Sequence, residues 1–275
     1  MIISTMQLAH CYPNFENHPS ITKEMRKRIE PHLLPLDHPA KPILDKLFSK
    51  KGITETLDSL VEAGFITVSV RPTSYVIVVK HPALPGYLMK IYLESETRIK
   101  QEREGWEWLT FRCIGAKNIR NVIKEKKLKY FSVPDKYLYP LPIASGAYNQ
   151  PIILICTEMH LLDQEKTNRI WMDQITKEHL KELYELLCVG GSSPHVRWNM
   201  PFTKEGKFTC IDTEHPFRRP NFKVVNKYLS PKNAKLWNKI VKKREKGIVR
   251  PRSKEFRPAP VRTKPNVQQG IKIAA

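Results

Sequence analysis

The chain has 275 residues, of which 41% are hydrophobic and 9% aromatic, so it is long enough and apolar enough to bury a core and is not disordered as a whole. Its formal charge of +20 is unevenly placed. Residues 218–275 carry 18 Lys and Arg against two acidic residues, whereas residues 1–217 carry 29 against 25. The positive charge is therefore concentrated in a C-terminal attachment that follows a nearly neutral folded part.

The first 64 residues predict a helical segment that is interrupted by prolines. Leu57, Leu60 and Val61 repeat at helical spacing, and Gly64 is typical of a residue that ends a helix. The pattern then changes to that of strands. Three apolar runs joined by short links predict strands at residues 65–70, 75–80 and 87–92.

A charged helix is expected from about Glu96 to Arg112, and a second one from about Ala116 to Lys127. Strand-like segments follow at residues 130–142 and 151–159. The second half of the chain is predominantly helical. Its clearest helix covers residues 176–191, with Thr176 as its N-cap and Gly190 at its end, and a basic helix covers residues 230–247. The Pro- and Arg-rich tail after it lacks periodicity, which predicts disorder.

Cysteine usage and apolar runs indicate the compartment. The five cysteines are odd in number and form no C-x-x-C pair, so neither a zinc site nor a disulfide framework is indicated. The N-terminus "MIISTMQLAHCYPN" is not a Sec signal peptide, and the longest apolar run, residues 152–156, is too short to span a bilayer. We expect a cytoplasmic protein without a transmembrane segment. Non-Sec export into another cell stays open, because it would leave no such signal.

The stretch "RWNMPFTKEGKFTCIDTE" at residues 197–214 combines a predicted hairpin with two oxygen-bearing side chains. Asn199 precedes the first short apolar run, and Asp212 follows the second one, with a Lys-Glu-Gly-Lys turn between the runs. Both side chains can therefore lie at one mouth of the hairpin. Oxygen ligands are those that Mg²⁺ prefers, and it usually takes one or two from the protein. The pattern predicts a divalent metal site.

The chain resembles the protein-kinase-like superfamily and would be an atypical kinase or a pseudokinase. The resemblance lies in the order of its elements, which is a lysine-bearing strand, an acidic helix, an apolar strand, a helix and N-x12-D. The resemblance covers roughly residues 65–215. It implies an α+β, two-lobed fold with a small antiparallel β-sheet N-lobe and a minimal helical C-lobe, preceded by a helical N-terminal segment. The expected boundaries are 1–64 for the N-terminal segment, 65–159 for the N-lobe and hinge, 160–229 for the C-lobe, and 230–275 for the basic helix and tail.

The resemblance also implies roles for individual residues. Lys90 in "YLMKIY" would hold the α/β-phosphates of ATP, and a carboxylate of the following helix, Glu102 or Glu107, would orient it. Glu158 and Met159 in "ICTEM" would frame the adenine. The metal ligands for Mg²⁺ or Mn²⁺ would be Asn199 and Asp212.

The chain departs from the family pattern where catalysis is concerned. The position of the catalytic aspartate, five residues before Asn199, is Pro194, which cannot accept a proton. Of its neighbours, only His195 has an ordinary pKa suited to a base at neutral pH. Asp212 is followed by Thr213 and Glu214 instead of Phe-Gly, and no activation-segment signature follows.

The loop that should cover the phosphates, residues 71–74, contains no glycine. Pro72 removes a backbone donor from this loop. Arg71, Thr73 and Ser74 could still bind a phosphate, although less closely.

Three functions follow as hypotheses. The first is an atypical kinase that binds ATP with Mg²⁺ or Mn²⁺ and transfers its γ-phosphoryl group to a hydroxyl of a protein or small molecule. The second is an inactive pseudokinase. The third is a non-enzymatic nucleic-acid-binding or scaffold protein that acts through residues 218–275. Such a basic arm binds polyanions by counterion release, and nucleic acid and the anionic surface of a membrane are its candidate partners.

Overall fold

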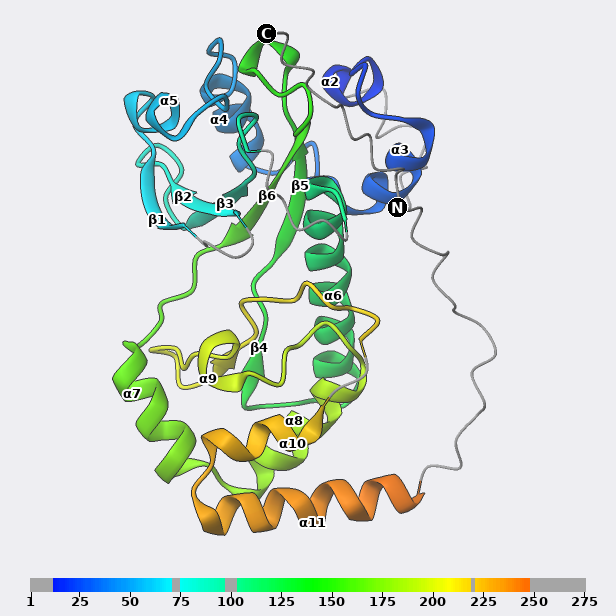
Figure 1. Ribbon diagram of the computed structural model, residues 1–275, viewed down its shortest axis with the longest axis vertical. Coiled ribbons are helices and arrows are strands. Elements are labelled where there is room, and N and C mark those ends of the chain that lie inside the picture. Colours follow the sequence, from blue (N-terminus) through cyan, green and yellow to red (C-terminus); the bar gives the residue numbers. More distant parts are fainter. Residues whose placement is uncertain (1–11, 71–74, 97–102, 219–220, 248–275) are drawn as a thin grey trace, which may run out of the picture.

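The fold is α+β, with a five-stranded antiparallel sheet between helical segments (Figure 1). The computed structural model describes residues 12–70, 75–96, 103–218 and 221–247. The helices that precede the sheet are α2 (Pro13–Glu16), α3 (Lys23–Ile29), the 3-10 turn η1 (Glu30–His32), α4 (Ala40–Leu47) and α5 (Leu57–Glu62).

The sheet contains all five of the longer strands that the apolar runs predict. Its order is β1-β2-β3-β6-β5, and every neighbouring pair is antiparallel. The interior strand β6, between β3 and β5, is buried along nearly its whole length, which explains its unbroken apolar sequence. The bounds are β1 (Ile66–Val70), β2 (Ile77–Lys80), β3 (Tyr87–Ile91), β5 (Lys136–Pro140) and β6 (Ile152–Thr157), with the 3-10 turn η2 (Ile143–Ser145) between the last two.

One long helix, α6 (Gly105–Glu125), corrects the prediction of two separate helices in this part of the chain. It begins after the N-cap Glu104 and continues without interruption past Gly115, where a break was expected. The earlier part of the first expected helix, residues 97–102, lies outside the described residues. In Figure 1, α6 passes beside β5 and then runs on toward the second half of the chain.

The second half of the chain is mainly helical. The N-cap role of Thr176 is confirmed, because its hydroxyl accepts from the backbone N–H of His179. Its helices are α7 (Gln164–Arg169), the π-helical turn η3 (Ile170–Gln174), α8 (Lys177–Cys188), α9 (Val196–Asn199), α10 (Phe222–Val225), the 3-10 turn η4 (Asn226–Tyr228) and α11 (Pro231–Gly247). Among the described residues, none of the helices is long and apolar enough to cross a membrane.

The predicted hairpin exists in a reduced form. Phe202 and Phe208 form a single antiparallel bridge, and Gly206 occupies the turn with φ +82°. The returning segment β7 (Phe208–Thr209) pairs in parallel with β4 (Phe131–Ser132). This second, two-stranded sheet fixes the segment that ends at Asp212.

The buried apolar side chains form two clusters. The first joins the N-terminal helices, the five-stranded sheet and the first half of α6, so residues 12–64 share a core with the sheet. The second joins the end of α6 to α8, β4, β7, α10 and α11. Trp106 and Leu109 of α6 belong to the first cluster, and Ile119 and Val122 belong to the second, so one helix connects the two.

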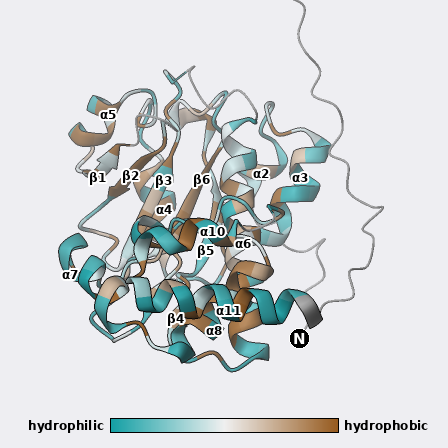
Figure 2. Ribbon diagram, turned by 60° about the horizontal axis from the view of Figure 1, so that its bottom comes forward, coloured by the Kyte–Doolittle hydropathy of each residue, from teal (hydrophilic) through white to brown (hydrophobic). Residues whose placement is uncertain are grey.

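Part of the basic C-terminal region belongs to the folded core. This corrects the expectation that residues 218–275 are an attachment to a folded part that ends at residue 217. Val225, Leu229 and Trp237 are buried in the second cluster, and the indole N–H of Trp237 donates to the Phe222 carbonyl at 2.8 Å. Hydrophobic residues (brown) concentrate on the sheet strands in Figure 2, whereas α3 and α11 carry long hydrophilic (teal) stretches. The expected disordered tail, residues 248–275, lies outside the described residues.

Candidate functional site

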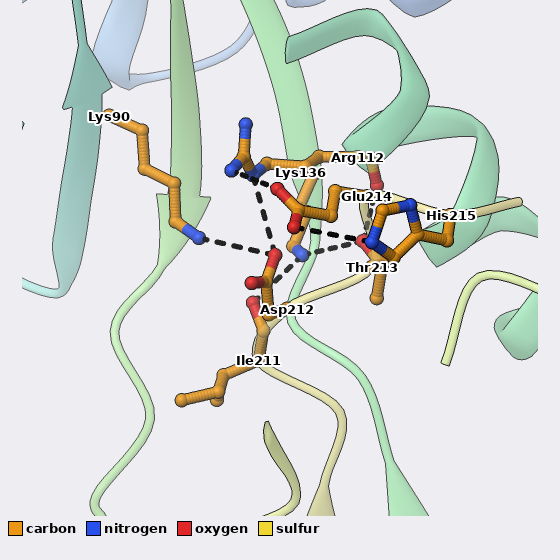
Figure 3. Close-up of polar contacts among 8 residues, drawn as sticks. All are labelled: Lys90, Arg112, Lys136, Ile211, Asp212, Thr213, Glu214 and His215. Atoms are coloured by element: carbon orange, nitrogen blue, oxygen red, sulfur yellow. Dashed lines mark hydrogen bonds and ion pairs between the residues drawn. The ribbon is translucent and has the colours of Figure 1, made fainter. Parts of the chain in front are cut away.

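Charged side chains from three parts of the chain meet beside the sheet (Figure 3). Lys90 extends from β3, and its Nζ lies 4.0 Å from Oδ1 of Asp212. Arg112 reaches the same oxygen from α6, with its Nε at 3.4 Å. Asp212 follows β7, so the aspartate predicted from the hairpin does lie beside the lysine predicted from the strand.

Glu214 extends this cluster on the side of α6. Its Oε2 accepts a hydrogen bond from Nη2 of Arg112 at 2.6 Å, and its Oε1 lies 3.4 Å from Nε2 of His215. Arg112 therefore binds two carboxylates that are two positions apart in the chain. Its side chain is only 2% exposed, so these contacts are in a largely water-free environment.

Lys136, the first residue of β5, fixes the backbone that carries Asp212. Its Nζ donates to the Ile211 carbonyl at 3.0 Å and to Oγ1 of Thr213 at 2.8 Å. The Thr213 hydroxyl in turn donates to the Arg112 carbonyl at 2.6 Å. Residues 211–213 are thereby held between β5 and α6, and Asp212 is positioned by buried hydrogen bonds on both of its neighbours.

Two glycines allow this segment to approach α6 closely. A Cβ at Gly115 would lie 2.2 Å from the Thr213 carbonyl oxygen and 2.9 Å from the Cα of Gly191. Gly191 has φ +91°, and its N–H donates to the His215 carbonyl at 3.0 Å. Since no larger residue fits at Gly115 without displacing backbone, glycine at this position is what lets residues 213–215 run against the helix.

Burial and neighbouring charge act in opposite directions on the cations. Burial lowers the pKa of Lys90, while the charge of Asp212 counteracts part of that effect. Burial also lowers the pKa of Arg112, but the adjacent Asp212, Tyr92 and Glu214 outweigh it and raise the pKa above its ordinary value. Lys136 has few compensating partners, so burial and the nearby charge of Lys90 lower its pKa to about 7.

A cavity of about 270 Å³ opens onto Lys90 and Arg112. We call it the first cavity. Its walls are largely apolar and come from β1, β2, β3, the end of β6 and the segment after it, and Asp212 and Glu214 also line it. The apolar lining residues are Val68, Val76, Val78, Leu88, Pro134, Cys156, Met159, Leu161 and Ile211.

A second cavity, of about 420 Å³, lies on the other side of the two carboxylates and is more polar. Asp212 and Glu214 border both cavities. Asn199, the other predicted metal ligand, borders the second cavity with Asp212, and its carbonyl accepts from the Ile211 N–H at 3.1 Å. His195, the candidate base, also borders this cavity, and its Nδ1 lies 2.9 Å from the Tyr228 hydroxyl.

Several predicted site residues are placed elsewhere. Glu107, expected to orient Lys90, forms its short ion pair with Arg28 of α3 at 2.8 Å. Among the described residues, the carboxylate that pairs with Lys90 is Asp212. Oε1 of Glu158 lies 3.5 Å from Nζ of Lys80 in β2, whereas Met159 lines the first cavity. The predicted residues Arg71, Thr73, Ser74 and Glu102 lie outside the described residues.

Sequence reasoning did not select Arg112 or Lys136, and it noted Glu214 only as a departure from the family pattern. Arg112 stands within a charged helical stretch, where a solvated position is the ordinary interpretation. Two signals were nevertheless present. Arg112 follows Leu109 and Phe111 on a helix, and Lys136 starts a strand whose alternate positions are apolar, so each interrupts a buried face and requires a partner.

The charges around Asp212 disfavour a divalent metal ion at this carboxylate. Among the described residues, no group of three or more His, Cys, Asp and Glu side chains could hold one. Asp212 is already within 4.0 Å of two cationic side chains. A metal at Asp212 would have to displace or be repelled by Lys90 and Arg112.

The sequence matches no known protein-family model, and no curated protein matches it. Among solved structures, the chain is similar to the complex of Rv3197 with erythromycin from Mycobacterium tuberculosis, with a TM-score of 0.33 and 13% sequence identity. The similarity covers 88% of this chain and 68% of that chain. The likeness is distant, so the site is interpreted from its own geometry.

Proposed function

We propose that this chain is a kinase-like protein that binds ATP in the first cavity. The observation that carries the proposal is the meeting of Lys90 and Asp212, 4.0 Å apart, at the charged end of an otherwise apolar cavity. An apolar wall suits a nucleobase, and buried cations suit phosphates. In this proposal Val78, Leu88 and Met159 contact the adenine, and the phosphates lie toward Lys90.

The two-lobed arrangement of kinase-like proteins is part of this proposal. The division of the buried side chains into two clusters connected by α6 supports it, as does the position of the first cavity, which takes lining residues from the sheet and from the segment Ile211–Glu214. The first cavity is slightly smaller than the range of about 300–1,000 Å³ typical of ligand sites. The adjoining second cavity offers further space beyond the carboxylates.

We favour a pseudokinase over a phosphoryl-transferring enzyme. Pro194 occupies the position expected for the catalytic base and cannot accept a proton. The nearest substitute, His195, is exposed and forms a contact with the Tyr228 hydroxyl. Asp212 is engaged by two cations instead of being free to hold a metal. These features support binding more than transfer.

Thermal unfolding with and without ATP tests this function. A ligand at about 100 times its Kd adds about 2.7 kcal/mol of stability, which corresponds to a Tm increase of roughly 5–10 °C for a chain of this length. We expect this increase for the wild type and its loss in Lys90→Met. The matched control is Lys80→Met, which removes a half-exposed lysine from the neighbouring strand. An unchanged wild-type Tm, with Mg²⁺ or with a chelator, would contradict the proposal.

A second candidate function is the binding of a nucleic acid by the basic C-terminal region. The observation that favours it is the orientation of α11. The helix buries Trp237 in the second core cluster and leaves a stripe of cations on the opposite side. The exposed cations of this stripe are Lys232, Lys235, Lys239, Lys242 and Lys243. This function is independent of the first cavity, so one chain can have both.

A further inference from the structure

The Arg112 guanidinium has one donor that the two carboxylates do not occupy. Its Nη1 atom is buried and has no partner with hydrogen-bond geometry among the described residues, although Tyr92 lies near enough to interact with the guanidinium. Nε and Nη2 are occupied by Asp212 and Glu214. A buried donor without a partner is destabilising. Since Arg112 lines the first cavity, a ligand oxygen there would satisfy it.

The charges around this donor favour an anion. Lys90 with Asp212 and Glu214 alone would have a formal charge of −1, which repels a polyphosphate. Arg112 brings the formal sum to 0, and Lys136, whose pKa is lowered to about 7, adds a further positive charge in the fraction of molecules in which it is protonated. Lys136 does not line the cavity, but it interacts electrostatically with both Lys90 and Asp212. The two side chains therefore supply part of the charge that a divalent ion would otherwise supply.

The carboxylates of Asp212 and Glu214 are paired with cations, in contrast to carboxylates that are free to bind a metal ion. Oε2 of Glu214 lies 2.6 Å from Nη2 of Arg112, and among the described residues the cation nearest to Asp212 is Arg112, whose Nε lies 3.4 Å from Oδ1. An arginine guanidinium is planar, remains charged at any ordinary pH, and matches phosphate oxygens with two parallel donors. A phosphate that approaches Arg112 can bind Nη1 while the carboxylates keep their present partners.

We infer that the first cavity binds the polyphosphate of its nucleotide directly through Arg112 and Lys90, without a divalent metal ion. This inference rests on the proposed ATP binding and specifies its chemistry. Arg112 is the principal phosphate ligand in this arrangement. Lys136 is a positioning residue that holds residues 211–213 and contributes charge.

Isothermal titration of the full chain with ATP, once in EDTA and once in Mg²⁺, tests the inference. We expect the two Kd values to agree within about threefold. Binding that is at least tenfold tighter with Mg²⁺ would overturn the inference and leave the proposed ATP binding intact. Failure to bind under both conditions would overturn both.

Variants separate a phosphate ligand from a structural residue. In EDTA, Arg112→Met should weaken ATP binding by roughly tenfold to a hundredfold, and Arg112→Lys should restore part of it. The matched control is Arg120→Met, which removes a more exposed arginine of the same helix and should leave the Kd unchanged. Equal weakening in Arg112→Met and Arg120→Met would contradict a specific role for Arg112.

Asp212→Asn gives an independent readout that does not depend on the stability of the Arg112 variants. The substitution keeps the shape of the side chain and removes a negative charge from the phosphate end. If the protein's cations bind the phosphates, Asp212→Asn should bind ATP in EDTA at least as tightly as the wild type. If a metal held by Asp212 were needed, the variant would lose binding by tenfold or more, and the inference would be wrong.

Discussion

At the scale of single residues, Lys136 links the site to stability. Burial, with a further contribution from Lys90, lowers its pKa to about 7, whereas a lysine in an unfolded chain has a pKa near 10.4. Between these two values the unfolded chain binds more protons than the folded one. The contribution of Lys136 to the free energy of unfolding therefore increases as the pH rises from about 7 toward 10.

Urea unfolding at several pH values measures this contribution. Between about pH 7 and pH 9, the free energy of unfolding of the wild type should rise relative to that of Lys136→Met by up to about 1.4 kcal/mol per pH unit. Lys129→Met is the matched control, because Lys129 is exposed, and its profile should parallel that of the wild type. Parallel profiles for Lys136→Met and the wild type would show that Lys136 titrates normally.

The sequence identified those site residues that stand within or directly after an apolar, strand-like run. Lys90 in an apolar strand and Asp212 after an apolar strand both stand out, and the structure places them 4.0 Å apart. Arg112 was missed because a basic residue in a helix is ordinary unless its environment is known. Glu107 was misplaced for the same reason, since α3, which carries its partner Arg28, has no sequence signal that links it to α6.

At the scale of elements, Gly115 decides how α6 packs against the segment that carries the carboxylates. Glycine in a helix interior costs about 1 kcal/mol relative to alanine, so helix propensity alone predicts that Gly115→Ala stabilises the protein. The packing predicts the opposite, because the new Cβ would lie 2.2 Å from the Thr213 carbonyl oxygen. Since the clash is with backbone, a rotamer change cannot relieve it.

We expect Gly115→Ala to lower the free energy of unfolding by about 2 kcal/mol or more. This corresponds to a Tm decrease of roughly 4–8 °C, measurable by circular dichroism. Lys117→Ala, at an exposed position of the same helix, should change the Tm little. An increase in Tm for Gly115→Ala would mean that residues 213–215 do not pack against α6 as described.

Elements with a clear local pattern were predicted well, and those that depend on distant contacts were not. The alternating apolar runs gave the strands of the five-stranded sheet, and the cap at Thr176 was placed correctly. The expected gap between Arg112 and Ala116 was wrong, because the close approach of Thr213 to Gly115, which explains a glycine inside the helix, is not visible in the sequence. The pairing of β4 with β7 links segments about 75 residues apart and has no local signature.

At the scale of the whole molecule, the helix α11 has one side in the second core cluster and one in solvent. Trp237 is fully buried, and Asn233 donates to the Ile175 carbonyl at 3.2 Å. Deleting residues 218–275 would therefore remove part of the core together with the charge. A test of the basic surface has to change its charge while the packed side of α11 stays intact.

A triple substitution on the exposed stripe satisfies this requirement. Lys235→Glu, Lys239→Glu and Lys242→Glu together leave Trp237 in place. With a labelled single-stranded RNA as probe, we expect the Kd to weaken by about tenfold at low salt. If the three lysines contact three phosphates, the slope of log K against log salt should fall in magnitude by about 2. The Tm increase with ATP should remain, because the first cavity lies in a different part of the molecule.

The control changes the net charge of the protein by the same amount at another place. Lys27→Glu, Lys50→Glu and Lys51→Glu are exposed positions on the N-terminal helical segment. If α11 is the binding surface, this second triple variant should bind RNA nearly as well as the wild type. Equal weakening in both triple variants would mean that net charge alone attracts the polyanion. In that case the orientation of α11 would have no role in binding, and only the first cavity would remain as a specific site.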